Sequence, residues 1–331
     1  MDLAIYAVFI PLTALALDLI LGEPPLILHP VVWMGRLIGF LDGKIERGRS
    51  WREKALGVLL GIFPIVLFVA LFTILLALLR DLGGALLWII GSALIFKTTF
   101  AVRALERHTL PMIEDLRRND LDAARKKASM VVSRDTSSLD RKHLISCAAE
   151  TVAENLVDSA LSPMFYFGLA GVPAAVAYRV SNTEDAMVGY LDDNHRQVGW
   201  FSARLDDATN YPVARLSVPF ILLALVLMRK DWRRAWHAAK RDWKQTSSPN
   251  KGWPMAAVAG GLGVKFEKIG HYSMGEGEVS NDPEVILDTV KVMRTTVLLF
   301  FVLVVLPLYV IIGVYVQVFL ENLFLQLLSI A

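Results

Sequence analysis

Long apolar runs separated by polar intervals dominate the chain. Four runs are long and apolar enough to cross a bilayer as helices, namely 3–21, 55–79, 83–100 and 296–319. Two further apolar windows, 159–180 and 212–228, contain prolines, so each is expected to be a broken or re-entrant helix. The pattern predicts an all-α, polytopic helical membrane protein that folds as one membrane-embedded domain over 1–331.

The polar intervals indicate the topology. Residues 22–54, 101–158 and 229–295 are rich in Lys and Arg and include amphipathic helical patterns, so they are expected on the cytoplasmic side. Residues 181–211 hold only two Lys or Arg, against ten in 101–158, and charge alone would place them outside the cell. If the broken windows on either side turn back, 181–211 faces the cytoplasm instead. The first apolar run has no basic segment before it and is interpreted as a retained anchor.

The composition argues against a nucleic-acid binder and rules out a disulfide within the chain. The mean hydropathy is +0.48 and the net charge is +2, which fits a protein of the lipid bilayer and not a nucleic-acid binder. Cys147 is the single cysteine, so no disulfide can form within the chain. The basic pattern at 229–245, which includes three tryptophans, indicates an element at the membrane surface.

Residues 133–158 form the longest strongly polar interval, and Ser137 and Ser138 are expected to cap a helix there. One stripe of that amphipathic helix contains His143, Cys147, Glu150, Glu154 and Asp158. The three carboxylates repel one another, so the stripe is either a solvated face with basic neighbours or a site for a divalent cation. Because the helix leads into an apolar segment, we favour the cation, with Glu150, Glu154 and Asp158 as candidate Mg²⁺ ligands.

Polar residues before this helix supply further candidates. Arg134 and Asp135 fit either a phosphate-binding turn or an ordinary capping turn with an ion pair. Asp18, Glu23 and His29 crowd a proline-rich turn at one membrane edge. His29 is therefore either a structural residue or part of a site.

A second acidic cluster occupies 178–211. Asp206 and Asp207 precede Asn210 by four and three positions, close enough to share a ligand on a helix. The segment 192–194 fits a surface turn. Further along, 247–263 combines a turn with small residues, and 270–283 is interpreted as a flexible loop.

Three kinds of function fit these features. One is an enzyme that handles a phosphorylated substrate at a metal-dependent cytoplasmic site. Another is a cation-coupled transporter, in which broken helices bind ions at mid-membrane. The third is a membrane prenyltransferase with paired aspartates, as in DDATN. The acids lie mostly in long polar segments and not within the spans, which favours an enzyme over a transporter.

Six sequence segments follow one another between about Asp18 and about Gly270, and both their residues and their order are informative. They read DLILGEP…HPVVWMGRLI, SRDTSSLD, ETVAENLVDSALSPMFY, SNTEDAMVGY, SARLDDATNY and SSPNKGWP. Together they closely resemble the adenosylcobinamide-phosphate synthase family of cobalamin biosynthesis. The chain departs from the family's usual pattern at Met255, where an acid is common, so no metal or base role is carried over to that position.

The resemblance implies an integral membrane ligase. Such an enzyme joins a propionate carboxylate of adenosylcobyric acid to aminopropanol or its phosphate, with ATP as co-substrate and Mg²⁺ as cofactor. It also implies a multi-pass protein of the inner (cytoplasmic) membrane whose active site faces the cytoplasm. The corrinoid is then a substrate, and a homo-oligomer or an association with other enzymes of the corrinoid pathway is the expected assembly.

The candidate residues are assigned on this basis. Mg²⁺ or amine positioning is expected of Glu150, Glu154 and Asp158, and a second metal or base role of Asp185, Asp206 and Asp207. The candidates for binding substrate or phosphate are Arg134, Asp135, Asn155, Asn182, Arg204, Asn210, His29 and Asn250.

Overall fold

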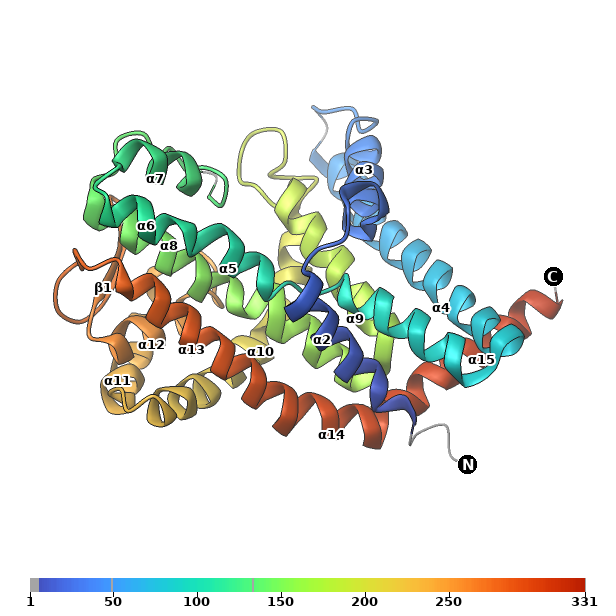
Figure 1. The fold of residues 1–331 in the computed structure, drawn as a ribbon. Coiled ribbons are helices and arrows are strands. Elements are labelled where there is room, and N and C mark those ends of the chain that lie inside the picture. Colours follow the sequence, from blue (N-terminus) through green and yellow to red (C-terminus); the bar gives the residue numbers. More distant parts are fainter. Residues whose placement is uncertain (1–5, 49, 133, 331) are drawn as a thin grey trace. The chain divides into compact units, whose positions relative to one another are not determined.

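The computed structural model describes residues 6–48, 50–132 and 134–330, with the side chains of 328–330 left out. Residues 3–5 of the first expected span and Ser133 of the polar interval lie outside the described residues. The fold is helical apart from one two-stranded hairpin, as expected (Figure 1). Within the predicted single domain, the chain divides into two compact units. Unit 1 comprises Met1–Ala101, Ser162–Thr209 and Val302–Ala331, and unit 2 comprises Val102–Leu161 and Asn210–Phe301.

Unit 1 is built on apolar helices. Its elements are α2 (Phe9–Leu21), η1 (Leu26–Leu28), α3 (Pro30–Asp42), α4 (Ser50–Lys97), α9 (Ser162–Val188), the first part of α10 (Trp200–Leu227), most of η4 (Phe301–Val305), α14 (Leu306–Leu308), η5 (Tyr309–Gly313) and α15 (Val314–Ile330). Helix α9 packs against α3, α4 and α15, and α2 packs against α4. Gly84 has φ 63° and ψ −159°, which divides α4 into two helical segments. The expected spans 55–79 and 83–100 correspond to these segments, apart from the last three residues of the second.

Helix α9 is interrupted inside the window 159–180. Gly171 has φ 65°, and a Cβ atom there would lie 2.0 Å from Oε1 of Gln317 in α15. The same oxygen accepts a hydrogen bond of 3.1 Å from the backbone N–H of Val172, which the interruption leaves without its helical partner. A side chain of a neighbouring helix therefore caps the break.

The second expected break does not occur. Residues 212–227 form part of α10, which runs as one helix from Trp200 to Leu227 with Pro212 and Pro219 inside it. Each proline removes one backbone N–H donor, which a long apolar helix can tolerate when neighbouring groups satisfy the freed carbonyls. The DDATN segment consequently lies on a helix.

Unit 2 is organised around α8 (Arg141–Leu156). The other elements are α5 (Arg103–Thr109), α6 (Pro111–Arg117), α7 (Leu121–Ala128), η2 (Val157–Leu161), the second part of α10, α11 (Trp232–Asp242), η3 (Trp243–Gln245), α12 (Gly252–Leu262), β1 (Lys265–Lys268), β2 (Tyr272–Gly275) and α13 (Glu284–Phe300). Helices α5, α7, α12 and α13 and strand β1 all pack against α8. The antiparallel hairpin β1–β2 occupies the start of the expected loop 270–283.

Two expectations for α8 are wrong. Asp140, and not Ser137 or Ser138, caps the helix, because its Oδ1 accepts from the backbone N–H of His143 at 2.9 Å. The helix also has no solvent-exposed polar face between Leu144 and Ala153, because every residue in that range is buried. The surrounding elements of unit 2 cover its polar stripe as well as its apolar face.

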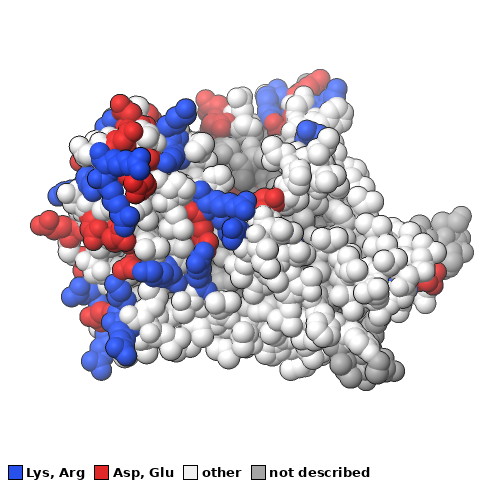
Figure 2. All heavy atoms as spheres, viewed as in Figure 1, with Lys and Arg blue, Asp and Glu red and all other residues white. Residues whose placement is uncertain are grey.

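Four helices are long and apolar enough to cross a membrane, namely Ser50–Lys97, Arg141–Val188, Trp200–Leu227 and Glu284–Leu327. In Figure 2, charged side chains gather over the elements of unit 2 near α7, β1 and α11, whereas the surface of α2 and α4 is almost entirely uncharged. Leu67, Leu71 and Leu75 illustrate that apolar surface, because each is at least 40% exposed along α4. Lipid chains can cover such an apolar surface and shield it from water.

Candidate functional site

Two adjoining cavities in unit 2 share one polar wall made by Glu154, Lys268 and Tyr272. The larger cavity, of about 390 Å³, is also lined by Gln245, Thr246, Ser247, Lys251, Met255 and His271. The smaller cavity, of about 180 Å³, is also lined by Val131, Val132, Arg134, Glu150, Thr151 and Asn155. Helix α8, the segment before α12 and the β hairpin therefore meet around one charged space.

Glu150 lies at the floor of the smaller cavity with both carboxylate oxygens engaged. Its Oε2 accepts from the Tyr272 hydroxyl at 2.8 Å and from Arg134 Nη2 at 3.2 Å. Its Oε1 accepts from the Ser146 hydroxyl, whose oxygen in turn accepts from the backbone N–H of Glu267 at 2.8 Å. The carboxylate is almost fully buried, so these charge-assisted bonds offset its lost hydration. Glu150 thus fixes the positions of Arg134, Tyr272 and β1.

The partners of Glu150 keep defined protonation states. Burial tends to lower the pKa of Arg134, but the adjacent Glu150 carboxylate outweighs it, so the guanidinium stays charged. Burial, together with the negative charge of Glu150, raises the pKa of the Tyr272 phenol far above its ordinary value. Tyr272 is therefore a neutral hydrogen-bond donor and cannot act as a base.

Glu154 is the carboxylate that faces both cavities. Its Oε1 lies 2.7 Å from Nζ of Lys251, and its side chain is 30% exposed. Lys251 directly precedes α12, and Gly252 must be glycine, because a Cβ there would lie 2.1 Å from the backbone oxygen of Trp243. This close approach places Lys251 opposite one turn of α8. The helical periodicity of α8 could not predict this neighbour, because it comes from another segment.

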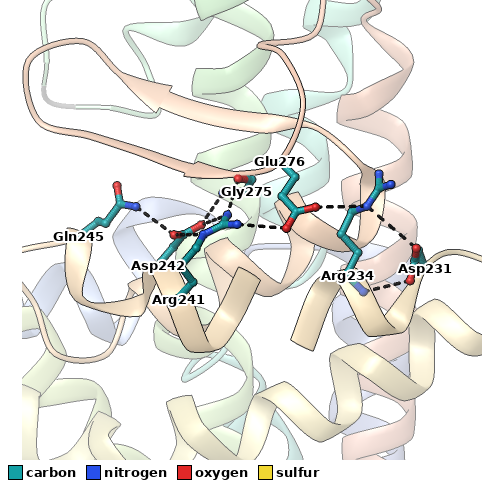
Figure 3. Close-up of polar contacts among 7 residues, drawn as sticks. All are labelled: Asp231, Arg234, Arg241, Asp242, Gln245, Gly275 and Glu276. Atoms are coloured by element: carbon teal, nitrogen blue, oxygen red, sulfur yellow. Dashed lines mark hydrogen bonds and ion pairs between the residues drawn. The ribbon is translucent and has the colours of Figure 1, made fainter. Parts of the chain in front are cut away.

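The hairpin is held in place by α11. Asp242 accepts from the backbone N–H of Gly275 at 2.9 Å, and Arg241 donates to the Gly275 carbonyl at 2.7 Å (Figure 3). Gln245 bonds to Asp242 at 3.1 Å, and its own oxygen accepts from the backbone N–H of Ser273 at 3.0 Å. Burial would raise the pKa of Asp242, but Arg241 and the backbone N–H lower it overall. A charged tether thus fixes β2.

The membrane-edge residues assemble in unit 1. Lys97 Nζ lies 3.3 Å from Asp18 Oδ1 and 2.9 Å from Glu23 Oε1. His29 Nε2 lies 2.7 Å from Glu23 Oε2, and His29 Nδ1 accepts from the backbone N–H of Val31 at the start of α3. The sequence grouping of Asp18, Glu23 and His29 is therefore real, and Lys97 is the cation that joins it. His29 acts here as a helix cap.

The second acidic cluster also lies in unit 1. Asn182 donates to Asp206 at 3.1 Å and accepts from Arg179 at 2.9 Å, which joins α9 to α10. Asp206 is buried, Asp185 and Asp207 are half-buried, and Arg204 is exposed. These residues of α9 and α10 are the unit 1 members of the predicted site.

Comparison with known proteins establishes the family. The family model described as CobD/Cbib protein matches residues 11–299. The probable cobalamin biosynthesis protein CobD of Methanothermobacter thermautotrophicus is 42% identical over 289 residues, which cover 87% of this chain and 94% of that protein. The cobalamin biosynthesis protein CobD of Dehalococcoides mccartyi is 40% identical over 265 residues, covering 80% of this chain and 85% of that protein. This chain belongs to the CobD/Cbib protein family. No solved structure matches it.

In this CobD/Cbib family member, four of the predicted site residues line the paired cavities: Arg134, Glu150, Glu154 and Asn155. Others in unit 2 lie elsewhere: Asp135 accepts from the backbone N–H of Ser137, and Asn250 accepts from Arg215. Asp158 follows α8 in η2 and lines neither cavity. Asn210 is buried and also lines neither cavity.

The three-carboxylate metal site is not assembled. Within the described ranges, no group of three or more His, Cys, Asp or Glu side chains is arranged to hold a metal ion. Glu150 is saturated by its hydrogen bonds, and Glu154 is paired with Lys251. Spacing along one helix placed the acids on one side, but their partners come from other elements.

Sequence reasoning missed Lys251, Lys268 and Tyr272 as members of the site. Lys251 could have been found, because it stands in the segment SSPNKGWP that supports the family resemblance. Lys268 and Tyr272 carry no such signal. Their segment has the composition of a loop, and only the pairing of β1 with β2 turns both toward α8.

Proposed function

We propose that this member of the CobD/Cbib family acts in cobalamin biosynthesis as an ATP- and Mg²⁺-dependent amide-forming ligase. It would join a propionate carboxylate of adenosylcobyric acid to aminopropanol or aminopropanol phosphate. The observation that supports this proposal is the pair of adjoining cavities, in which Glu154 and Lys268 line both, Lys251 lines the larger and Arg134 lines the smaller. The names of the relatives supply the pathway, and the charged lining suits substrates that bear carboxylate, ammonium and phosphate groups.

The reaction needs activation of the carboxylate. A carboxylate and an ammonium ion do not condense at neutral pH, because hydroxide is a poor leaving group and the protonated amine is no nucleophile. Transfer of the terminal phosphoryl group of ATP to the carboxylate gives an acyl phosphate and ADP. The deprotonated amine then attacks the acyl carbon and expels phosphate. Cations of the cavity wall would stabilise the transferring phosphoryl group.

Glu154 is the proposed proton acceptor for the ammonium group. It is the partly exposed carboxylate of the wall, whereas Glu150 is saturated and buried. Lys251 Nζ, at 2.7 Å, is the partner of Glu154 before the amine arrives. Asp185, Asp206 and Asp207 of unit 1 stay predictions for a second metal or base role.

The donor set fits a magnesium ion that arrives with phosphate. Mg²⁺ is a hard cation that is commonly bound by one or two carboxylates together with the phosphates of a substrate. The phosphates would be its main ligands here, because Glu154 is assigned to the amine and Glu150 is engaged by three donors. When bound, the ion would neutralise phosphate charge during phosphoryl transfer.

A purified-component assay tests the function. The full chain in detergent is incubated with adenosylcobyric acid, Mg²⁺, ATP and either aminopropanol or its phosphate, and the amide product is measured. Product should require ATP. A transporter would bind its cargo without ATP and form no product, and a prenyltransferase would consume a prenyl diphosphate instead. Absence of amide with either amine would refute the proposal.

The proposed location is the inner (cytoplasmic) membrane, with the site open to cytoplasmic ATP. The proposed assembly is a homo-oligomer or an association with other corrinoid-pathway enzymes. In a Cys147→Ser background, which removes the single native thiol, a cysteine is placed at the exposed Asn194 in a variant that still forms product. Residue 194 should resist an impermeant thiol reagent in intact cells. Labelling from outside would refute the cytoplasmic placement of 181–211.

A further inference from the structure

The charges around the paired cavities do not cancel. Two carboxylates, Glu150 and Glu154, line the cavities together with Arg134, Lys251 and Lys268. Arg134 is paired with Glu150 and Lys251 with Glu154. Among the residues that the structure describes, Lys268 has no carboxylate partner. The wall therefore carries one unneutralised positive charge, which favours an anionic ligand.

The hairpin presents Lys268 in a fixed place. Lys268 ends β1 and pairs in register with Tyr272, the first residue of β2. The turn between them is closed by a 2.9 Å hydrogen bond from the backbone N–H of His271 to the Lys268 carbonyl, with Gly270 at φ +75°. Tyr272 is tied to Glu150 of α8. The cation thus stands on a strand end that is fixed on both sides.

The rest of the larger cavity is rich in hydrogen-bond donors. Ser247 contributes a hydroxyl group and His271 an imidazole, whereas the Thr246 hydroxyl donates to the Ser248 carbonyl. Lys251 adds a second ammonium group at the same wall. A compact cation that shares a cavity with a second ammonium group and a hydroxyl donor suits the tetrahedral oxygens of a phosphoryl group.

We propose that Lys268 is the principal ligand of a phosphate subsite in the larger cavity. The ligand class is a phosphate monoester or the terminal phosphates of a nucleoside triphosphate. The proposal rests on the proposed function for the identity of those ligands, which are aminopropanol phosphate and ATP. Ser247 completes the subsite by donating to a phosphate oxygen, because the Thr246 hydroxyl already donates to the Ser248 carbonyl at 2.8 Å.

Equilibrium binding to the detergent-purified full chain tests the subsite. The two probes are an ATP analogue with a non-transferable terminal phosphate and aminopropanol phosphate, measured separately with Mg²⁺. Lys268→Met should weaken one probe about 10- to 100-fold, the loss expected for one charge-assisted hydrogen bond. The probe that is weakened identifies which phosphate occupies the subsite.

Lys265 provides the matched control. It lies on the same strand, has no carboxylate partner among the described residues and lines neither cavity. Lys265→Met should leave the affinity for both probes within about twofold of the original protein, since distant surface charges are screened. Lys268→Gln serves as a second variant if Lys268→Met does not fold.

The outcomes separate the subsite from the reaction. Unchanged affinity for both probes in the folded Lys268 variant overturns the subsite, and amide formation by the unaltered protein would then leave the proposed function standing. Loss of binding that depends on Lys268 supports the subsite even if no amide forms. Binding of neither probe to the unaltered protein overturns the subsite. An equal loss of affinity in the Lys265 variant also overturns it, because the effect would be one of net charge.

Discussion

Units 1 and 2 both bury charged side chains, but they use them differently. In unit 1, Lys97 bridges Asp18 and Glu23, and the adjoining cavity of about 530 Å³ is lined mainly by Leu, Pro and aromatic side chains. In unit 2, Arg134 and Lys251 each have one carboxylate partner, and the adjoining cavities are polar. In the first arrangement the charged groups pair with one another beside an apolar cavity, whereas in the second Lys268 lines polar cavities and has no carboxylate partner among the described residues.

A second cluster in unit 1 follows the same rule. Glu321 accepts from Trp88 at 2.8 Å and from Gln317 at 3.0 Å, and it pairs with Arg80 at 2.8 Å. Gln317 also caps the break in α9. These polar groups satisfy backbone and side chains inside apolar helices, where unpaired groups are costly. The buried charges of unit 1 are therefore matched by partners inside that unit, and the cation without a carboxylate partner lies at the polar cavities of unit 2.

The change expected to have the largest effect is the loss of the Glu154 carboxylate in unit 2. Glu154→Gln should reduce amide formation at least about 100-fold, since it removes the proposed proton acceptor while keeping the shape of the side chain. The measurement is turnover of purified variant that unfolds at the same temperature as the original protein. Glu267→Gln is the matched control, because Glu267 pairs with His143 in the same unit and lines neither cavity. Near-normal turnover of Glu154→Gln would make the Glu154–Lys251 pair structural.

In unit 1, loss of a buried carboxylate should lower stability and leave turnover unchanged. Glu321→Gln leaves Arg80 without its charge partner and should destabilise the fold by about 3 kcal/mol, typical of breaking a buried pair. The apparent unfolding temperature in detergent should fall, while turnover per folded molecule stays unchanged. Asn322→Ala, which removes only an exposed partner of Arg80, should have little effect. If Glu321→Gln lost activity at full stability, the distinction between the units would fail.

A smaller effect is expected at the tether of the hairpin. Asp242→Asn should cost about 1–2 kcal/mol and speed hydrogen exchange in β1 and β2, because it weakens bonds to Arg241 and Gly275. The pKa of Asp242 is lowered in the folded state, so its contribution is present at neutral pH and is lost as the pH falls through that value. The difference between variant and original protein should therefore shrink below about pH 4.

Asp231 offers the control for the tether. It caps the other end of α11, where Asn is an equally good cap, and it does not contact the hairpin (Figure 3). Asp231→Asn should leave exchange in β1 and β2 unchanged. Equal exchange in the Asp242 and Asp231 variants would show that α11 does not hold the hairpin.

The class of fold and the family could both be predicted from the amino-acid sequence. Runs of apolar residues long enough to cross a bilayer identify spanning helices without any tertiary information, because the backbone in lipid must satisfy its own hydrogen bonds. The resemblance carried by six ordered segments is confirmed by the match over residues 11–299. The crowding of Asp18, Glu23 and His29 was also readable, since a short proline-rich turn cannot separate them widely.

Only the tertiary structure decided which polar residues share a space. Helical periodicity puts Glu150, Glu154 and Asp158 on one side of a helix, but it cannot show that Arg134 and Tyr272 saturate Glu150. Those partners come from a preceding turn and from a hairpin more than a hundred residues away, and no local rule links them. Lys251 and Lys268 reach the same wall because buried backbone contacts and β pairing place them there. Local sequence sets which groups each segment offers, and packing between segments sets which of them stay unpaired.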